Sequence, residues 1–153
     1  KYKNNSKKIK KVKKPWGYEL WIASKEYKAK FAMSKFLLNQ VLKQFSISRK
    51  KGRMQLYING TGKFYISKNK INLQKFKNNK YTDGDLKKII ENLEVFNLKK
   101  GSSFYIKPLF VHSVLSTKGL LMMESSTLEL DDVYRIFDES GRGHGRIRSE
   151  HEK

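Results

Sequence analysis

Short runs of aromatic and β-branched residues, separated by turn residues at close intervals, dominate this sequence. Such runs are typical of β-strands, and strands at short spacing favour a barrel or a double sheet. No internal repeat or coiled-coil heptad competes with this pattern. We therefore predict an all-β fold. The expected strands are residues 15–23, 30–37, 40–48, 54–59, 63–67, 103–107, 111–116, 120–125 and 133–138, with one more inside 86–98.

Two stretches decide how these strands connect. Gly60-Thr61-Gly62 separates two strand-like runs, which predicts a hairpin turn rather than a phosphate-binding loop, because no Gly-Lys-Ser/Thr sequence and no helix start follow it. Residues 86–98 remain open between two interpretations. Their first half has apolar residues at helical spacing, whereas their second half fits a strand.

Size and composition exclude several protein classes. The chain has 153 residues, enough for one domain, and it contains no cysteine, so disulfides and thiolate metal sites are absent. It shows no apolar run long enough to span a membrane and no signal-peptide pattern, and we expect a cytoplasmic protein. The formal net charge of +20 attracts anionic partners in general. An AT-rich coding sequence is the competing explanation, since 28 lysines stand against 6 arginines.

The charge and glycine distribution divides the chain into three parts. Residues 1–14 carry eight lysines and no acid, and we predict a basic N-terminal arm there. Residues 15–142 hold the strand-like runs and form the predicted barrel. Residues 143–153 form a predicted C-terminal tail. Arg135 and Arg142 lie among acids near the end of the barrel, where they either form ion pairs or recognise phosphate.

Three motifs resemble the cupins that are similar to the C-terminal domain of type II mannose-6-phosphate isomerases. Residues 14–21 (Lys-Pro-Trp-Gly-Tyr-Glu-Leu-Trp) resemble the entry strand of that family, and residues 124–142 resemble its closing segment. Between them, Ile106-Lys107-Pro108 followed by His112 resembles the second cupin motif. The resemblance implies a single cupin-like double-stranded β-helix, a jelly-roll barrel, that acts on sugar phosphates or nucleotide sugars. It also makes a homodimer the expected oligomer.

The same resemblance implies a metal site whose ligands this chain lacks. Cupins usually hold a divalent metal through His-x-His-x₄-Glu in the first motif and one histidine in the second. Only His112 matches, whichever glycine closes the first motif. Because one imidazole does not hold a transition metal tightly, we expect no metal ion and no cofactor. Closure on Gly62 places the ligand positions at Ser48, Lys50 and Gln55, and closure on Gly60 places them at Ser46, Ser48 and Arg53.

The candidate site follows from these positions. His112 and Lys50 are the candidate catalytic residues, because an imidazole is a suitable general acid or base and an ammonium group replaces the charge of the missing metal. The alternatives are a core histidine and one more solvated lysine. The candidate substrate-binding residues are Ser48, Gln55, Tyr57, Arg135 and Arg142.

Three functional hypotheses remain open. The first is a metal-independent cupin that acts on or binds a sugar phosphate or nucleotide sugar, isomerase-like if it turns over, with His112 moving a proton. The second is a catalytically silent cupin that binds a carbohydrate or an acidic partner. The third, a basic nucleic-acid-binding protein, is suggested by charge alone and ranks last, because no recognition motif accompanies the lysines.

Overall fold

The computed structural model describes residues 10–14, 17–21, 31–37, 44–48, 52–72, 74–75, 82–126, 133–138 and 145–146. Two of its strands are long, β5 (Arg53–Ile66) and β8 (His112–Ser126), and the helix α2 (Asp83–Glu91) lies between β5 and β6 in sequence. The predicted all-β class is confirmed. The shorter strands are β1 (Lys10–Lys14), β2 (Gly17–Trp21), β3 (Phe31–Leu37), β4 (Gln44–Ser48), β6 (Glu94–Leu98), β7 (Ser103–Ile106), β9 (Val133–Asp138) and β10 (Gly145–Arg146).

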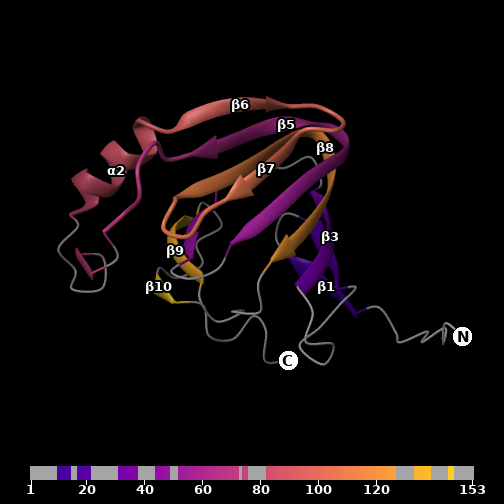
Figure 1. Ribbon diagram of the computed structural model, residues 1–153, viewed down its shortest axis with the longest axis horizontal. Helices are drawn as coiled ribbons and strands as arrows, with labels where there is room; N and C mark the ends of the chain where they lie inside the picture. The colour runs from indigo at the N-terminus through magenta and orange to yellow at the C-terminus, as the bar shows by residue number, and fades with distance from the viewer. Residues whose placement is uncertain are drawn as a thin grey trace, which may run out of the picture.

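The antiparallel pair β5–β8 organises the whole fold. The pair runs from Arg53 opposite Ser126 to Ile66 opposite His112, and both strands bend together in the middle (Figure 1). Each strand therefore contributes to two layers. The first layer contains residues 53–57 and 120–126 with β7, β3, β2 and β1, and the second contains residues 62–66 and 112–116 with β6, β4, β9 and β10.

The bend falls where the sequence predicted a hairpin turn, and that prediction is wrong. Gly60-Thr61-Gly62 lies inside the continuous strand β5, and residues 112–116 and 120–125 likewise belong to one strand, β8. Gly60 has a φ of 94°, and a Cβ there would lie 2.0 Å from the carbonyl oxygen of Gly119. A Cβ on Gly62 would lie 2.3 Å from the carbonyl oxygen of Leu115. Glycine is therefore needed because two backbones approach closely, rather than because the chain reverses.

The space between the two layers holds the main apolar core. Buried side chains from both layers meet there, so the layers are joined by packing as well as by the two bent strands. The core becomes polar farther along β5 and β8, and the candidate site lies at that polar end. The core residues are Tyr57, Phe64, Leu98, Ile106, Leu120 and Met122.

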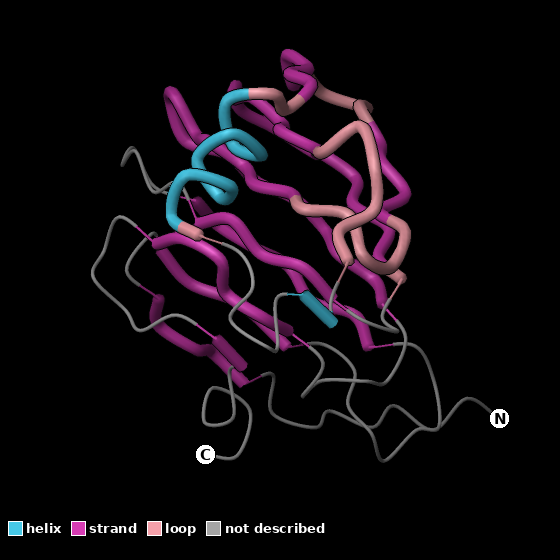
Figure 2. The backbone as a smooth tube through the Cα atoms, turned by 90° about the vertical axis from the view of Figure 1, so that its left-hand side faces the viewer, coloured by secondary structure: helices cyan, strands magenta, loops and turns pink. Residues whose placement is uncertain are grey.

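Residues 86–98 contain both of the elements that the sequence left open. A capping box starts α2, in which Thr82 Oγ1 accepts a hydrogen bond from the Asp85 backbone N–H while an Asp85 carboxylate oxygen accepts from the Thr82 N–H. Asn92 ends the helix, and β6 begins two residues later. The apolar face of α2 packs on a second cluster around Ile71, Val111 and Ile136, and Figure 2 shows α2 along one side of the strands. Among the described residues, no helix is long and apolar enough to span a bilayer.

The described part of the predicted basic arm forms a strand. Lys10–Lys14 form β1, which pairs antiparallel with β2. The Lys11 ammonium lies 4.1 Å from the centre of the Tyr18 ring, a cation–π contact. The sequence argument found no hydrophobic periodicity here, but backbone pairing with β2 and the long lysine stems provide order without it. The residues before Lys10, and the division of the chain into arm, barrel and tail, stay predictions.

The close approach of β5 and β8 predicts a large effect of a single methyl group. Gly60→Ala should reduce the free energy of unfolding by about 3 kcal/mol or more, because the Cβ meets backbone rather than a movable side chain. Gly101→Ala is the matched control, since Gly101 also has a positive φ of 85° but has nothing within 4 Å of its hypothetical Cβ. It should lose only the conformational term of about 1–2 kcal/mol. Urea unfolding measures both, and equal losses would contradict the close approach.

Candidate functional site

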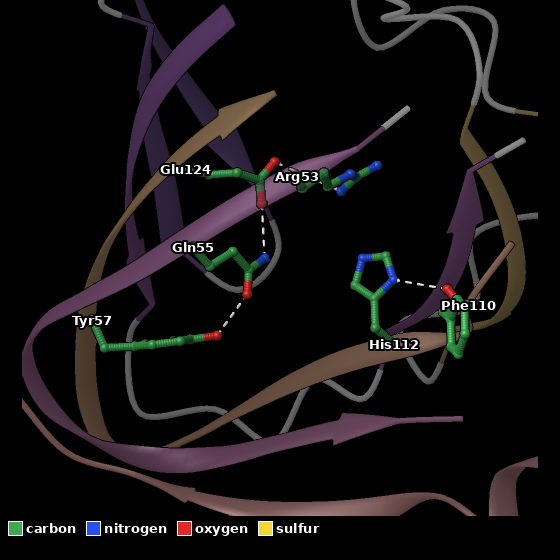
Figure 3. Close-up of polar contacts among 6 residues, drawn as sticks. All are labelled: Arg53, Gln55, Tyr57, Phe110, His112 and Glu124. Carbon is green, nitrogen blue, oxygen red and sulfur yellow. Dashed lines mark hydrogen bonds and ion pairs between the residues drawn. The ribbon is translucent and has the colours of Figure 1, made fainter. Parts of the chain in front are cut away.

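Three polar side chains project from β5 into the space between the layers. Arg53, Gln55 and Tyr57 are buried, whereas the intervening Met54 and Leu56 are exposed. This alternation follows from the two-residue period of a strand. In Figure 3 the three side chains follow one another along β5, with Tyr57 nearest the bend. A strand that is buried on one face therefore carries a row of polar groups inward.

A fourth side chain, Glu124 of β8, completes this row. Glu124 lies directly opposite Gln55 in the strand register, and it is only 2% exposed. The Gln55 Nε2 donates a hydrogen bond of 2.8 Å to Glu124 Oε2. The Arg53 Nη1 lies 3.7 Å from Glu124 Oε1, which makes a buried ion pair (Figure 3). Each oxygen of the carboxylate thus faces a donor from β5.

Tyr57 gives this network a fixed direction. Its hydroxyl donates a hydrogen bond of 2.6 Å to Gln55 Oε1. Burial, followed by the negative charge of Glu124, holds the pKa of the Tyr57 phenol well above its usual value near 10. The phenol therefore stays protonated and remains a donor. The Gln55 amide can then point only one way, with its oxygen toward Tyr57 and its nitrogen toward Glu124.

His112 faces this row from the second layer. It is 5% exposed, and in Figure 3 its ring points toward the side of Gln55 and Arg53. Its Nδ1 lies 3.2 Å from the carbonyl oxygen of Phe110. A carbonyl oxygen only accepts hydrogen bonds, so Nδ1 carries the proton in this contact. In the neutral ring Nε2 is then the basic nitrogen, which suits His112 to accept a proton.

The donor set does not fit a divalent metal. The described residues contain no group of three or more histidine, cysteine, aspartate or glutamate side chains that could hold one ion. Closure of the first cupin motif on Gly62 puts Gln55 at the carboxylate position, and closure on Gly60 puts Arg53 there. Both side chains are buried, so neither placement supplies a carboxylate ligand from β5. The Arg53 guanidinium and the Gln55 amide nitrogen lie beside Glu124 as donors, so they occupy the carboxylate that would otherwise bind a cation. The expected absence of a metal stays a prediction, and no step is assigned to one.

Among the predicted site residues, Gln55 and Tyr57 are joined by a hydrogen bond, and His112 lies on the facing layer. Arg135 lies in β9 opposite Ser46, and Ser46 also pairs with His112, so the backbones of Arg135 and His112 occupy one cross-strand row. Ser48 lies in β4 opposite Val133, away from that row. The side chains of Ser48 and Arg135, and the whole of Lys50 and Arg142, lie outside what the structure describes.

Two site residues were missed by the sequence argument. Glu124 was noted only as part of the closing motif, and Arg53 only as one alternative ligand position. A usable signal for Glu124 is its place in the apolar run 120–125, where it is the only acid between Glu94 and Glu129. Arg53 shares the two-residue period of Gln55 and Tyr57. An isolated acid and an isolated arginine on inward positions of two strands suggest a buried pair.

The raised pKa of Tyr57 predicts a stability difference at alkaline pH. Above about pH 10 the unfolded phenol ionises while the folded one does not, so folding loses stability by up to about 1.4 kcal/mol per pH unit. Tyr57→Phe has no phenol at this position and lacks this loss. The unfolding free energy of the wild type minus that of Tyr57→Phe should therefore decrease between about pH 8 and about pH 11. Tyr105→Phe, at an exposed tyrosine of β7, is the control. A constant difference between wild type and Tyr57→Phe across this range would contradict the assignment.

Comparisons with known proteins support the fold. No protein-family model and no curated protein sequence matches the chain. Similar solved structures include the hydroxypropylphosphonic acid epoxidase of S. wedmorenis, with a TM-score of 0.55, 10% identity, and coverage of 76% of this chain and 54% of the epoxidase. The capsular polysaccharide assembling protein CapF of Staphylococcus aureus gives a TM-score of 0.60 at 9% identity, over 82% of this chain and 33% of CapF. The oxalate decarboxylase of Bacillus subtilis, a protein with Mn(II) centres, gives 0.53 at 14% identity, over 77% and 27%.

These three are cupin-fold proteins, and the chain spans about half of the epoxidase and less of the other two. Identities this low show a shared fold, and a fold alone does not assign an activity. The similarity to mannose-6-phosphate isomerases stays a prediction. The two bent strands, the two layers and these likenesses together give the chain a cupin-like, all-β jelly-roll fold.

Proposed function

We propose that the polar end of the barrel binds a sugar phosphate or a nucleotide sugar without a metal ion. The observation that carries this proposal is the hydrogen-bonded row of Tyr57, Gln55, Glu124 and Arg53 facing His112. Carboxylate, amide and guanidinium groups fixed side by side are suited to a ligand with many hydroxyl oxygens, because each hydroxyl both donates and accepts. Burial of the row makes these contacts stronger than they would be in water.

The two layers offer complementary polar groups. On the β5 side, the Arg53 guanidinium carries five N–H donors and the Gln55 Nε2 carries a second hydrogen besides the one given to Glu124. On the β8 side, the His112 ring offers Nε2 as an acceptor when the ring is neutral. A ligand that presents an oxygen acceptor to β5 and a hydroxyl or acidic C–H proton to His112 matches this arrangement.

The phosphate group is assigned to residues near the second layer. The backbone of Arg135 shares the cross-strand row of His112 through Ser46, which is the reason for proposing Arg135 as a phosphate ligand. Lys50 follows β4 by two residues and is proposed to supply a further positive charge, with Arg142 beyond it in sequence. Guanidinium groups bind phosphate in a bidentate manner, and an ammonium group binds it as a point charge.

His112 is the proposed acid and base if the ligand is turned over. In an isomerase-like reaction its Nε2 takes a proton from the hydroxyl-bearing carbon beside a carbonyl group and returns it to the former carbonyl carbon, while the hydroxyl proton passes to the former carbonyl oxygen. Arg53 or Lys50 would stabilise the enediolate charge that develops between these steps. The alternative is a binding protein without turnover, which the loss of the usual metal ligands favours. Binding and turnover are therefore tested separately.

A binding titration tests the ligand. We expect hexose phosphates or nucleotide sugars to bind in isothermal titration calorimetry, the corresponding neutral hexoses to bind much more weakly, and a chelator to change neither. Lys50→Met should weaken the phosphorylated ligand by about 1.5–3 kcal/mol, since it removes a charged hydrogen bond. Lys118→Met, at an exposed lysine of β8, is the matched control and should bind normally. Equal binding of neutral and phosphorylated sugars would contradict the proposal.

A second measurement addresses turnover. Each bound sugar phosphate is incubated with the protein in deuterated water, and proton exchange at the carbon next to the carbonyl is followed by NMR. His112→Ala should abolish this exchange while reducing affinity only modestly. If the wild type binds the ligand and shows no exchange, the protein is a binder without isomerase activity.

The homodimer and the cytoplasmic location expected from the sequence stay predictions.

A further inference from the structure

Glu124 presents an electrostatic problem that the fold must solve. Its side chain is almost wholly buried, and an ionised carboxylate without a partner is strongly disfavoured in such surroundings. The Gln55 hydrogen bond satisfies one oxygen but carries no net charge. The charged partner is Arg53, whose Nη1 lies 3.7 Å from the other oxygen and whose side chain is itself buried.

We infer that the Arg53 guanidinium is the built-in cation of this barrel, held at the Glu124 carboxylate that a divalent metal would otherwise bind. Arg53 is the inward-facing residue of β5 that precedes Gln55 on the same face, two residues earlier in the chain. Both of these residues fall on positions that the metal-ligand pattern assigns to the carboxylate ligand. The protein therefore provides through its own chain the positive charge that a bound ion would bring.

Lys50, which the sequence suggested as a substitute cation, lies outside the described residues and stays a prediction. The position of Arg53 and its partner Glu124 are both described (Figure 3). A guanidinium is always charged and has five donors in one plane. It can therefore keep Glu124 ionised as a permanent counter-ion.

Glu124 and His112 are one carboxylate and one imidazole, both buried and on facing layers. A transition-metal site built on two histidines and a carboxylate needs one imidazole more. Arg53→His would place that imidazole beside the carboxylate and would remove the competing cation at the same time. This single substitution should then replace the guanidinium of Arg53 with a bound divalent metal ion.

Uptake of Co²⁺ tests the exchange. Folded Arg53→His, checked by circular dichroism, should bind about one more Co²⁺ per chain than the wild type, with the visible absorption of bound Co²⁺ and a higher Tm. Adding Glu124→Gln should abolish this extra uptake. The wild type is the necessary reference because His144 and His151 are present in both proteins. Glu124-dependent Co²⁺ binding by the wild type, or no extra binding by folded Arg53→His, would overturn the inference.

A coupling measurement holds even if Arg53→His does not fold. Arg53→Met should lower the Tm by about 10 °C, because it leaves the Glu124 carboxylate buried without its counter-ion. In a Glu124→Gln background the same substitution should lower the Tm by much less. Equal losses in both backgrounds would show that Arg53 is not the counter-ion. The inference rests on the metal-independent part of the proposed function. Neither experiment contains a sugar, so a negative result here overturns the role of Arg53, whereas a protein that fails to bind sugar phosphates overturns only the proposed ligand.

Discussion

The pairing of β5 with β8 is the constraint on which the rest of this structure depends. The two strands pair on both sides of a bend at which their register shifts. Every other described strand adds to one half of the pair or the other, directly or through a neighbour. Glycines at the bend let the backbones approach more closely than any side chain allows. The register of the pair then decides what meets inside, because it sets Gln55 opposite Glu124 and Arg53 one step farther along the same face.

Much of the fold could be predicted from the sequence, because the two-residue period and the frequent turn residues depend on local preferences. The continuity of the long strands could not. Gly60 and Gly62 look like turn residues in sequence, and only the position of β8 across from them shows that they mark a close approach instead. The order of residues 10–14 was missed for a similar reason, since pairing with β2 supplies what the lysine-rich sequence lacks. Long-range backbone contacts leave little local signal.

The site was predicted in part. His112, Gln55 and Tyr57 were selected through a motif resemblance, and the structure places all three among buried polar groups. Arg53 and Glu124 lie 71 positions apart in the chain, so their pairing appears only when β5 and β8 are aligned. The roles of the individual groups also depend on direction. Tyr57 donates to Gln55, and this sets the amide so that its nitrogen faces Glu124, a detail that residue types alone do not specify.

The bent strands β5 and β8 also connect the two layers mechanically, because each strand runs from one layer into the other. Arg53, Gln55 and Glu124 lie in one layer and His112 lies in the other, and the two layers are joined at the close approach of β5 and β8 near Gly60. A ligand that contacts both layers at the polar end would hold them together at the point farthest from the bend. Occupancy of the polar end would therefore reduce breathing between the layers along their whole length. Slower amide exchange far from the ligand would be its signature, without any contact there.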